Sequence, residues 1–295
     1  MRSLFAALAP LAAFATLAAC SRAPATTSPP LASAASAESA ASAASAASIA
    51  ASTQASAPPE TPPSTDAHPF ALVELFTSEG CSSCPPADAV LRDVAVAVAH
   101  GARTASRDVY ALSFHVDYWN ELGWPDRFSQ GAFTARQRAY ADARHERSVY
   151  TPQMIVNGRE ELNGGDAAGA RRAIDRALHA EPSRVALAAA VAGPGERGSD
   201  VVAVRFSTTG APPDAILYVA LVEPFATSRV TRGENAGKTL DHANVVRALD
   251  AAPLAAPSGV RALALPRDVP RESLEVVAWV QVPATMQVLA ATRAR

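Results

Sequence analysis

The chain is poor in cysteine and carries almost no net charge, and each shortage excludes a class of function. It has 295 residues, three cysteines and a net charge of −2. So small a net charge provides no electrostatic footprint for nucleic acid or for an anionic membrane surface. One Cys-x-x-Cys without a second cysteine pair supplies two of the four ligands that a structural zinc ion needs. We therefore expect no nucleic-acid partner, no metal and no other cofactor.

The N-terminal apolar segment is too short to span a membrane and instead resembles an export signal. Residues 1–20 contain one early charge, Arg2, followed by an apolar run from Leu4 to Leu17. This arrangement is typical of a secretory signal segment. It ends in Leu17-Ala18-Ala19-Cys20, which resembles a lipobox, so we predict lipidation of Cys20 and an outer-membrane lipoprotein of the periplasm. The alternative is ordinary cleavage at the small residues, without lipidation.

Residues 21–66 lack the large apolar side chains that a folded domain needs. Ala-Ala-Ser units are repeated, and prolines follow at positions 58, 59, 62 and 63. A segment of this composition cannot bury enough surface to offset the entropy of ordering. We predict a disordered tether that ends where the folded part begins, near Ala67.

The central motif of the folded part is Cys81-Ser82-Ser83-Cys84. It lies between a predicted strand, residues 70–77, and a predicted helix, residues 87–100. A Cys-x-x-Cys at such a junction is typical of thiol–disulfide exchange. Because helix N-termini favour a thiolate, we predict Cys81 as the exposed nucleophile and Cys84 as the resolving thiol. The structural alternative is a permanent disulfide. A bridge that closes so short a loop removes little entropy from the unfolded chain and therefore stabilises the fold little.

Periodicity divides the folded part into two predicted domains, residues 67–182 and 183–295. After the motif, the first domain has strand patterns at 109–116, 153–156 and 159–162, and helix patterns at 132–147 and 167–180. Asn157-Gly158 predicts a hairpin turn and Asp166 a helix cap. The resulting β-α-β-α-β-β-α order is that of a thioredoxin-like domain. The second domain has short apolar runs separated by glycine and proline, which predict an all-β companion domain.

Several motifs together resemble a secreted bacterial thioredoxin-like family, domain-of-unknown-function family 1223. The resemblance spans roughly residues 70–290 and implies an α/β fold with a thioredoxin-like domain. It also implies a cis-proline at Pro152 that faces the disulfide, whereas the alternative is an ordinary trans-proline at a strand start. Thr151, Pro152 and Trp119 are then the predicted substrate-binding residues. The motifs are Val73 to Asp88, Phe114 to Trp119, Phe133 to Tyr140, Tyr150 to Gln153 and Arg232 to Leu240.

Three polar residues near the first two strands are candidates for proton transfer to the cysteines. His115 and Asp117 follow the second strand, and loops after parallel strands gather on one edge of a sheet. Glu74 lies within the first strand. In the structural alternative, His115 and Asp117 belong to a polar turn whose hydrogen bonds are satisfied, and Glu74 reaches the sheet edge.

Residues 233–239, Gly-Glu-Asn-Ala-Gly-Lys-Thr, resemble a phosphate-binding loop, but their spacing excludes that function. The phosphate-binding motif has four residues between its glycines, and here there are three. No predicted strand leads into the segment. We predict a structural role or a contact with the first domain.

The sequence therefore predicts an exported thioredoxin-like protein whose Cys81–Cys84 pair exchanges with protein thiols or disulfides of the cell envelope. The rival prediction is a binding or scaffold module that keeps the pair as a structural disulfide. A copper site that combines the cysteines with His115 is a third alternative. Ser82 and Ser83 carry no charge, so they do not indicate the direction of the redox reaction.

Overall fold

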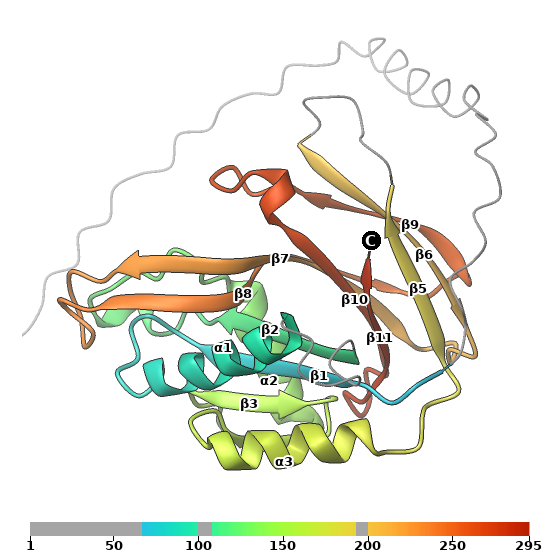
Figure 1. Ribbon diagram of the computed structural model, residues 1–295, viewed down its shortest axis with the longest axis horizontal. Coiled ribbons are helices and arrows are strands. Elements are labelled where there is room, and N and C mark those ends of the chain that lie inside the picture. The colour runs from blue at the N-terminus through green and yellow to red at the C-terminus, as the bar shows by residue number, and fades with distance from the viewer. Residues whose placement is uncertain (1–66, 100–107, 193–199, 295) are drawn as a thin grey trace, which may run out of the picture. The chain divides into compact units, whose positions relative to one another are not determined.

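The computed structural model describes residues 67–99, 108–192 and 200–294, and these belong to one compact unit (Figure 1). Cys20, the predicted signal segment and the predicted tether lie outside the described residues. No described helix is long and apolar enough to span a membrane. In chain order the elements are β1 (Ala71–Thr77), α1 (Pro85–Ala99), β2 (Val109–His115), the 3₁₀ turn η2 (Asn120–Leu122), α2 (Gly131–Ala143), β3 (Gln153–Val156), β4 (Glu160–Asn163), α3 (Ala167–Leu178), β5 (Ala186–Val191), β6 (Val201–Thr209), β7 (Ile216–Arg229), β8 (Thr239–Pro253), β9 (Ser258–Ala264), the 3₁₀ turn η3 (Arg271–Ser273), β10 (Glu275–Gln281) and β11 (Val288–Ala294).

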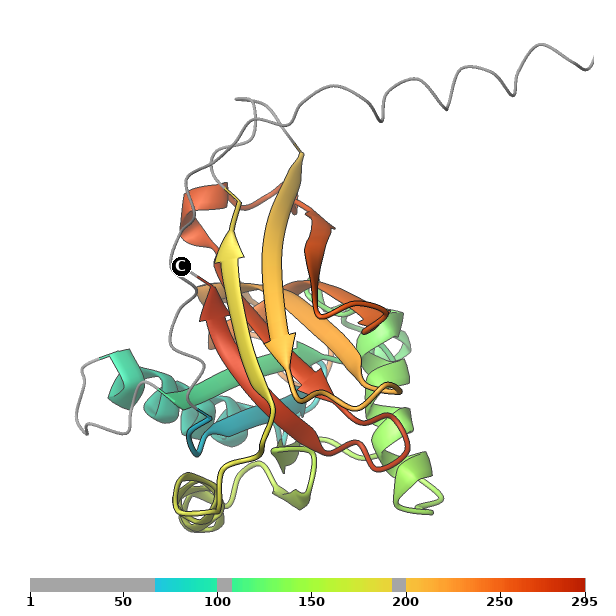
Figure 2. The ribbon, with the colours of Figure 1, turned by 90° about the vertical axis from the view of Figure 1, so that its right-hand side faces the viewer.

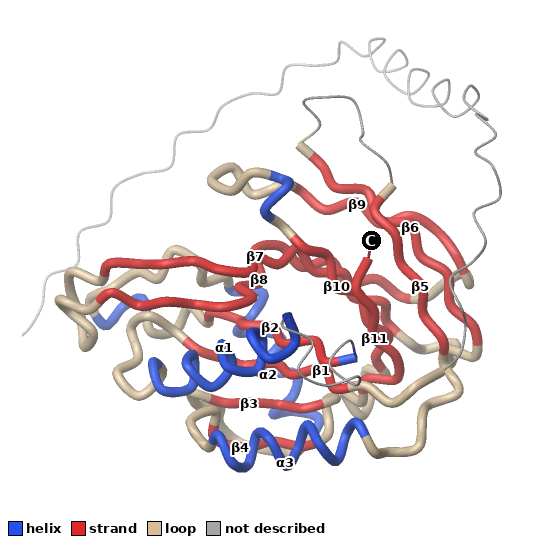
Figure 3. Tube along the Cα trace, in the orientation of Figure 1, coloured by secondary structure: helices blue, strands red, loops and turns tan. Residues whose placement is uncertain are grey.

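Eight strands form one mixed sheet in the order β11-β10-β7-β8-β2-β1-β3-β4 (Figure 3). β1 pairs in parallel with β2 and antiparallel with β3. The predicted parallel β1–α1–β2 unit and the predicted element order as far as α3 are therefore confirmed. The protein is of the mixed α/β class, with one large sheet and few helices.

β1 lies in the middle of the core because side chains on both of its faces are apolar. Every residue from Ala71 to Thr77 is buried. Successive side chains of a strand point to opposite faces. Leu72 and Phe76 pack with aromatic side chains of α2, whereas Val73 and Leu75 pack with α1 and α3. Because burial of each such side chain contributes about 1.5–3 kcal/mol, the two layers fix the strand that leads into the Cys-x-x-Cys motif.

β7 and β8 form a long hairpin that the sequence pattern predicts only in part. The apolar run Ile216 to Val222 accounts for only the first part of β7, and β8 corresponds to no apolar run of this kind. β8 pairs with β7 along its length and with β2 at Ser113–Val245. Several of its buried positions are small or polar, such as His242, Ala243 and Asn244. The strand therefore lacks the apolar run that identifies a buried strand in a sequence.

The large sheet crosses the domain boundary that we predicted between residues 182 and 183. β7, β8, β10 and β11 extend the sheet of β1–β4, whereas β5, β6 and β9 form a separate three-stranded sheet (Figure 2). The described residues after 183 form strands apart from short turns, but most of these strands do not make a sheet of their own.

A buried network built on one ion pair joins β1, α2 and β10. Arg136 Nε lies 2.6 Å from Oε2 of Glu74, and both side chains are almost fully buried. Arg136 Nη2 also donates to Oε1 of Gln281 at 3.0 Å, and Gln281 Nε2 donates to the Tyr140 hydroxyl at 3.0 Å. Because removal of one partner of a buried pair costs about 3–5 kcal/mol, the pair fixes α2 on β1, and the hydrogen bonds of Gln281 connect both to β10.

The Asn157-Gly158 turn docks on the C-terminal hairpin of β10 and β11. Its two residues have φ angles of 49° and 70°, which suit a two-residue hairpin turn, and β3 and β4 pair as predicted. The Val288 N–H donates to the Asn157 carbonyl at 3.0 Å. A Cβ atom on Gly158 would lie 1.8 Å from the carbonyl oxygen of Met286, so this position has no room for a side chain.

We expect Gly158→Ala to lower the free energy of unfolding by about 3 kcal/mol or more. The left-handed backbone costs an alanine about 1–2 kcal/mol, and the clash with Met286 adds an overpacking cost of about 1–3 kcal/mol. Gly237→Ala is the matched control, because Gly237 has a φ of 84° and a Cβ atom there meets nothing within 4 Å. Urea denaturation measures both losses. Equal losses in the two variants would contradict the close docking of the turn.

Candidate functional site

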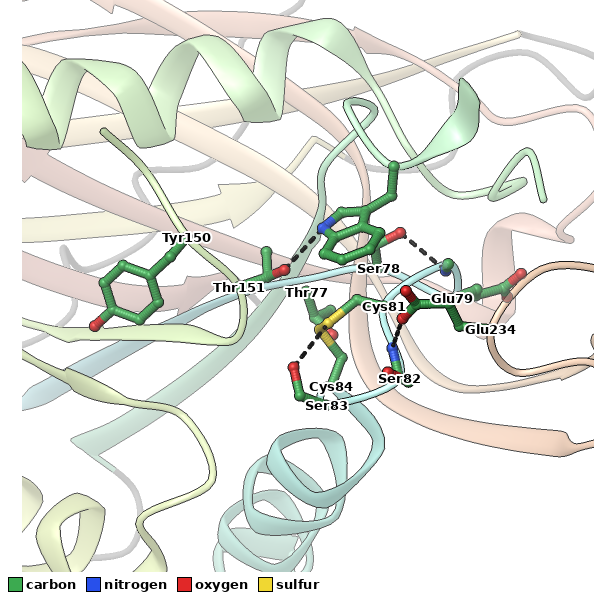
Figure 4. Close-up of a disulfide and its surroundings, with 12 residues drawn as sticks. Thr77, Ser78, Glu79, Cys81, Ser82, Ser83, Cys84, Tyr150, Thr151 and Glu234 are labelled. Carbon is green, nitrogen blue, oxygen red and sulfur yellow. Dashed lines mark hydrogen bonds between the residues drawn. A yellow bond between two sulfur atoms is a disulfide. The ribbon is translucent and has the colours of Figure 1, made fainter. Parts of the chain in front are cut away.

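The Cys81–Cys84 disulfide closes the turn between β1 and α1 (Figure 4). The two Cα atoms are 5.4 Å apart. The Cys84 N–H donates to the Cys81 carbonyl at 3.2 Å, and the Ala87 N–H donates to the Cys84 carbonyl at 2.8 Å. Pro85 and Pro86 occupy the first two positions of α1, where the missing N–H breaks no intrahelical hydrogen bond. The helix therefore begins directly at the second cysteine.

Both cysteines are fully buried, so the predicted exposure of Cys81 is wrong for the disulfide form. Cys81 and Cys84 each have an exposed fraction of 0%. Ser82 and Ser83, which lie between them, are exposed. The Ser83 hydroxyl is 3.3 Å from the Cys81 sulfur. The surface of the motif is thus formed by its two serines rather than by sulfur.

The three residues that we predicted to bind substrate lie together beside this turn. Trp119 Nε1 donates to Oγ1 of Thr151 at 2.8 Å, and Figure 4 shows Thr151 next to the cysteines. Trp119 also packs against Gly80, where a Cβ atom would lie 3.1 Å from the Trp119 Cβ. The Thr151–Pro152 peptide bond is cis, which confirms the predicted isomer. Substrate binding by these residues stays a prediction.

The loop between β7 and β8 holds the turn through two side chains. Glu234 Oε2 accepts a hydrogen bond from the Ser82 N–H at 2.9 Å. The Asn235 amide donates to the carbonyls of Glu79 and Cys81, each at 2.9 Å. Hydrogen bonds from the hydroxyl and N–H of Ser82 lower the pKa of Glu234. A carboxylate and an amide from a distant hairpin therefore hold the backbone of the motif.

This contact confirms one prediction for residues 233–239 and corrects another. The segment does contact the first half of the chain, as predicted. However, the expectation that no strand leads into it is wrong, because β7 ends at Arg229 and β8 begins at Thr239. The segment is a hairpin loop.

Two histidines and three carboxylates form a buried cluster next to the turn. His115 Nδ1 is 2.7 Å from Asp126 Oδ2, and the rings of His115 and His242 lie with their centroids 4.8 Å apart. His242 Nε2 is 3.4 Å from Glu79 Oε1, and His242 Nδ1 is 3.8 Å from Asp88 Oδ2. The cluster thus joins Glu79, which lies two positions before Cys81, to Asp88, which lies one helical turn after Cys84.

Burial and charge pairing shift the pKa values of the groups in this cluster in opposite directions. Burial raises the pKa of Asp88, although His242 and His115 oppose it. Burial alone would lower the pKa of His115, but the charge of Asp126 and the hydrogen bond to it raise the pKa overall. Burial would raise the pKa values of Glu79 and Asp126, but His242 lowers that of Glu79 and His115 lowers that of Asp126. The cluster therefore favours a charged His115–Asp126 pair, and burial shifts Asp88 toward its protonated form.

The composition of the cluster suits proton transfer. Its buried atoms Glu79 Oε1, His115 Nε2 and both His242 ring nitrogens have no hydrogen-bond partner within the described part of the chain. Across residues 67–99, 108–192 and 200–294, no group of three or more His, Cys, Asp or Glu side chains is placed to hold a metal ion. Imidazole and carboxyl groups can accept, hold and pass protons, and the His115–Asp126 pair is within hydrogen-bond distance.

The structure brings one of the three predicted proton-transfer residues into this cluster. His115 belongs to it, whereas Asp117 accepts a hydrogen bond from the Thr134 hydroxyl in α2 and Glu74 is paired with Arg136. The sequence prediction misses the other four members of the cluster, Glu79, Asp88, Asp126 and His242. Asp88 could have been found, because it lies four residues after Cys84 on the same helical face. His242 could not, because no strand was predicted there.

We expect Asp126→Asn to lower the pKa of His115, because it removes the charge that opposes burial. The raised pKa of native His115 means that the pair stabilises the fold fully below the unfolded histidine pKa of about 6.5. This contribution is lost as the pH rises through the folded pKa. The variant should also lose about 3–5 kcal/mol of unfolding free energy at low pH, as for other broken buried pairs.

NMR titration of the imidazole resonances and urea denaturation on both sides of neutral pH measure these effects. Asp117→Asn, which removes a carboxylate outside the cluster, is the control. An unchanged His115 titration in Asp126→Asn would contradict the coupling.

Sequence and structure comparisons identify a family and similar folds. The profile of a family described as "Protein of unknown function (DUF1223)" matches residues 72–281. No functionally curated protein matches the sequence. The crystal structure of Protein AGR_C_4864 from Agrobacterium tumefaciens is 27% identical with a TM-score of 0.57, over 78% of this chain and 95% of that one. HBP35 of Porphyromonas gingivalis is 15% identical with a TM-score of 0.56, over 78% of this chain and 76% of that one, a likeness of fold alone.

Proposed function

The chain belongs to the family described as "Protein of unknown function (DUF1223)", and we propose that it is an exported thioredoxin-like thiol–disulfide oxidoreductase. The observation that carries the proposal is the disulfide between Cys81 and Cys84 at the N-terminus of a helix. The element order from β1 to α3 supports the thioredoxin-like assignment. Its proposed partners are protein thiols or disulfides of the cell envelope.

The proposed reaction moves two electrons and two protons from a substrate dithiol to the Cys81–Cys84 pair, or the reverse. A substrate thiolate attacks the Cys81 sulfur, and the Cys81–Cys84 bond breaks as a mixed disulfide forms. Cys84 leaves as a thiolate and takes a proton, for which Asp88 in α1 is the proposed source. The second substrate thiolate then attacks the substrate sulfur of the mixed disulfide, and Cys81 leaves as a thiolate. Of the two protons that the substrate thiols release, one restores Asp88 and the other protonates Cys81.

Burial of both sulfurs sets a condition on this reaction. An attacking sulfur must approach in line with the disulfide, and Cys81 has no exposed surface. The groups around it include Ser83, whose hydroxyl contacts the Cys81 sulfur, and Trp119, which packs on the preceding glycine. Exchange therefore needs a local displacement of the Ser82-Ser83 segment or of Trp119 when a partner docks.

The same burial favours the rival function, a scaffold module with a structural disulfide. A buried bridge is protected from thiols in solution, as a permanent bridge is. The two functions differ in what happens when one cysteine is removed, because only exchange passes through a mixed disulfide with a partner.

We expect Cys84→Ser to trap mixed disulfides with envelope proteins, at least about tenfold more than Cys81→Ser does. Without the resolving thiol, the bond from Cys81 to a substrate persists. Trapped partners are measured on non-reducing gels and identified by mass spectrometry. The Cys81→Ser/Cys84→Ser double variant is the control for any adduct formed at Cys20. Equal, slow alkylation of both reduced cysteines without any trapped partner would favour the structural disulfide.

The proposal includes a lipid anchor at Cys20 and a tether over residues 21–66, which place the folded part on the periplasmic face of the outer membrane. We expect Cys20→Ala to move the protein from the membrane fraction to the soluble fraction, because the acylation site is lost. The urea midpoint of the folded part should stay the same. Unchanged membrane partition in this variant would rule out anchoring through Cys20.

A further inference from the structure

We propose that Glu234 is a positioning residue that lowers the reduction potential of the Cys81–Cys84 pair. The inference rests on the proposed function and assigns its redox direction. The segment between the cysteines, Ser82-Ser83, carries no charge of its own. The structure instead places a carboxylate on its first N–H group, at 2.9 Å, from a hairpin loop 152 residues further along the chain.

Glu234 is exposed, but its loop is held in place. The neighbouring Asn235 is fully buried and bonds the carbonyls of Glu79 and Cys81. Lys238 Nζ donates to Asn235 Oδ1 at 2.9 Å and so fixes the orientation of that amide. Gly233, with a φ of 73°, packs closely on Trp124. These contacts hold the exposed Glu234 carboxylate at the Ser82 N–H.

The other charged groups near the turn have partners of their own. The Glu79 carboxylate accepts from the Trp124 indole at 2.7 Å and lies beside His242. Asp126 accepts from the Glu79 N–H and pairs with His115. Lys238 is bound to Asn235. Glu234 is the carboxylate that bonds the segment between the cysteines, and its charge therefore acts on the outer side of the motif.

A carboxylate at this position disfavours the Cys81 thiolate. N–H groups at the start of a helix normally stabilise a thiolate and lower the thiol pKa. Ser82 precedes α1, and Glu234 places a negative charge on the N–H group of this residue, which directly follows Cys81. Because stabilising the reduced form makes a pair a stronger oxidant, destabilising the thiolate makes the disulfide harder to reduce. Glu234 thereby lowers the reduction potential of the Cys81–Cys84 pair and favours its action as a reductant.

The test is equilibration of the full-length protein with reduced and oxidised glutathione. In this reaction two glutathione thiols are oxidised to one glutathione disulfide, and the Cys81–Cys84 bond is reduced to two thiols. We expect Glu234→Gln, whose amide oxygen still accepts from Ser82, to shift the equilibrium toward the dithiol by about two- to fivefold. This shift equals about 10–20 mV for a two-electron couple. The variant should also alkylate Cys81 at lower pH, read by peptide mapping that separates Cys81 from Cys20.

Asp241→Asn is the matched control, because Asp241 is exposed in the same hairpin and bonds Thr227 rather than the motif. We expect no shift for this variant, a native value for Glu234→Asp, and a Glu234→Gln effect that shrinks as salt is raised to about 1 M. An unchanged equilibrium constant in Glu234→Gln, or an equal shift in Asp241→Asn, would overturn the proposal. Because glutathione replaces the protein partner, failure to trap partners with Cys84→Ser would count against the proposed function but not against this effect.

Discussion

The contact on which the candidate site depends is the buried amide of Asn235. It donates to the carbonyls of Glu79 and Cys81, which lie 156 and 154 residues earlier in the chain. A buried carbonyl left without a partner costs about 1–3 kcal/mol, and the Glu79 carbonyl lies before α1, outside the hydrogen bonds of the helix. The Cys-x-x-Cys turn is therefore completed by the β7–β8 hairpin, and a first half that ended at residue 182 would lack this support.

The same hairpin explains how the protein buries five ionisable groups beside a disulfide. An unpaired buried charge is costly, so buried charges are paired or neutralised. β8 contributes His242, which lies between Glu79 and Asp88, and β2 contributes His115, which pairs with Asp126. Asp88 is buried, and this burial raises its pKa. The fold thus tolerates the cluster by pairing its carboxylates with histidines and by favouring the protonated form of Asp88.

Local signals made the first half of the fold predictable, and long-range pairing made the second half hard to predict. The apolar run of β1, the Asn157-Gly158 turn and the Asp166 cap, which accepts from the Gly169 N–H, are each set by neighbouring residues. β8 is different, because its buried positions accept small and polar side chains once β7 and β2 flank it. His242 lies on that strand, and the loop that leads into it holds the Cys81 carbonyl. The sequence therefore identified the motif but not the environment that controls it.

Under the proposed function, the two cysteines are governed by charges on opposite sides of the turn. Glu234 acts on Cys81 from the exposed side, where water and salt weaken its effect. Asp88 lies near Cys84 on the buried side, where a low effective dielectric strengthens every interaction. The acidity of Cys81 and the proton exchange of Cys84 are thus set by different elements, a hairpin loop and a helix. Such a division allows the potential of the pair to change through the loop while the buried proton donor stays the same.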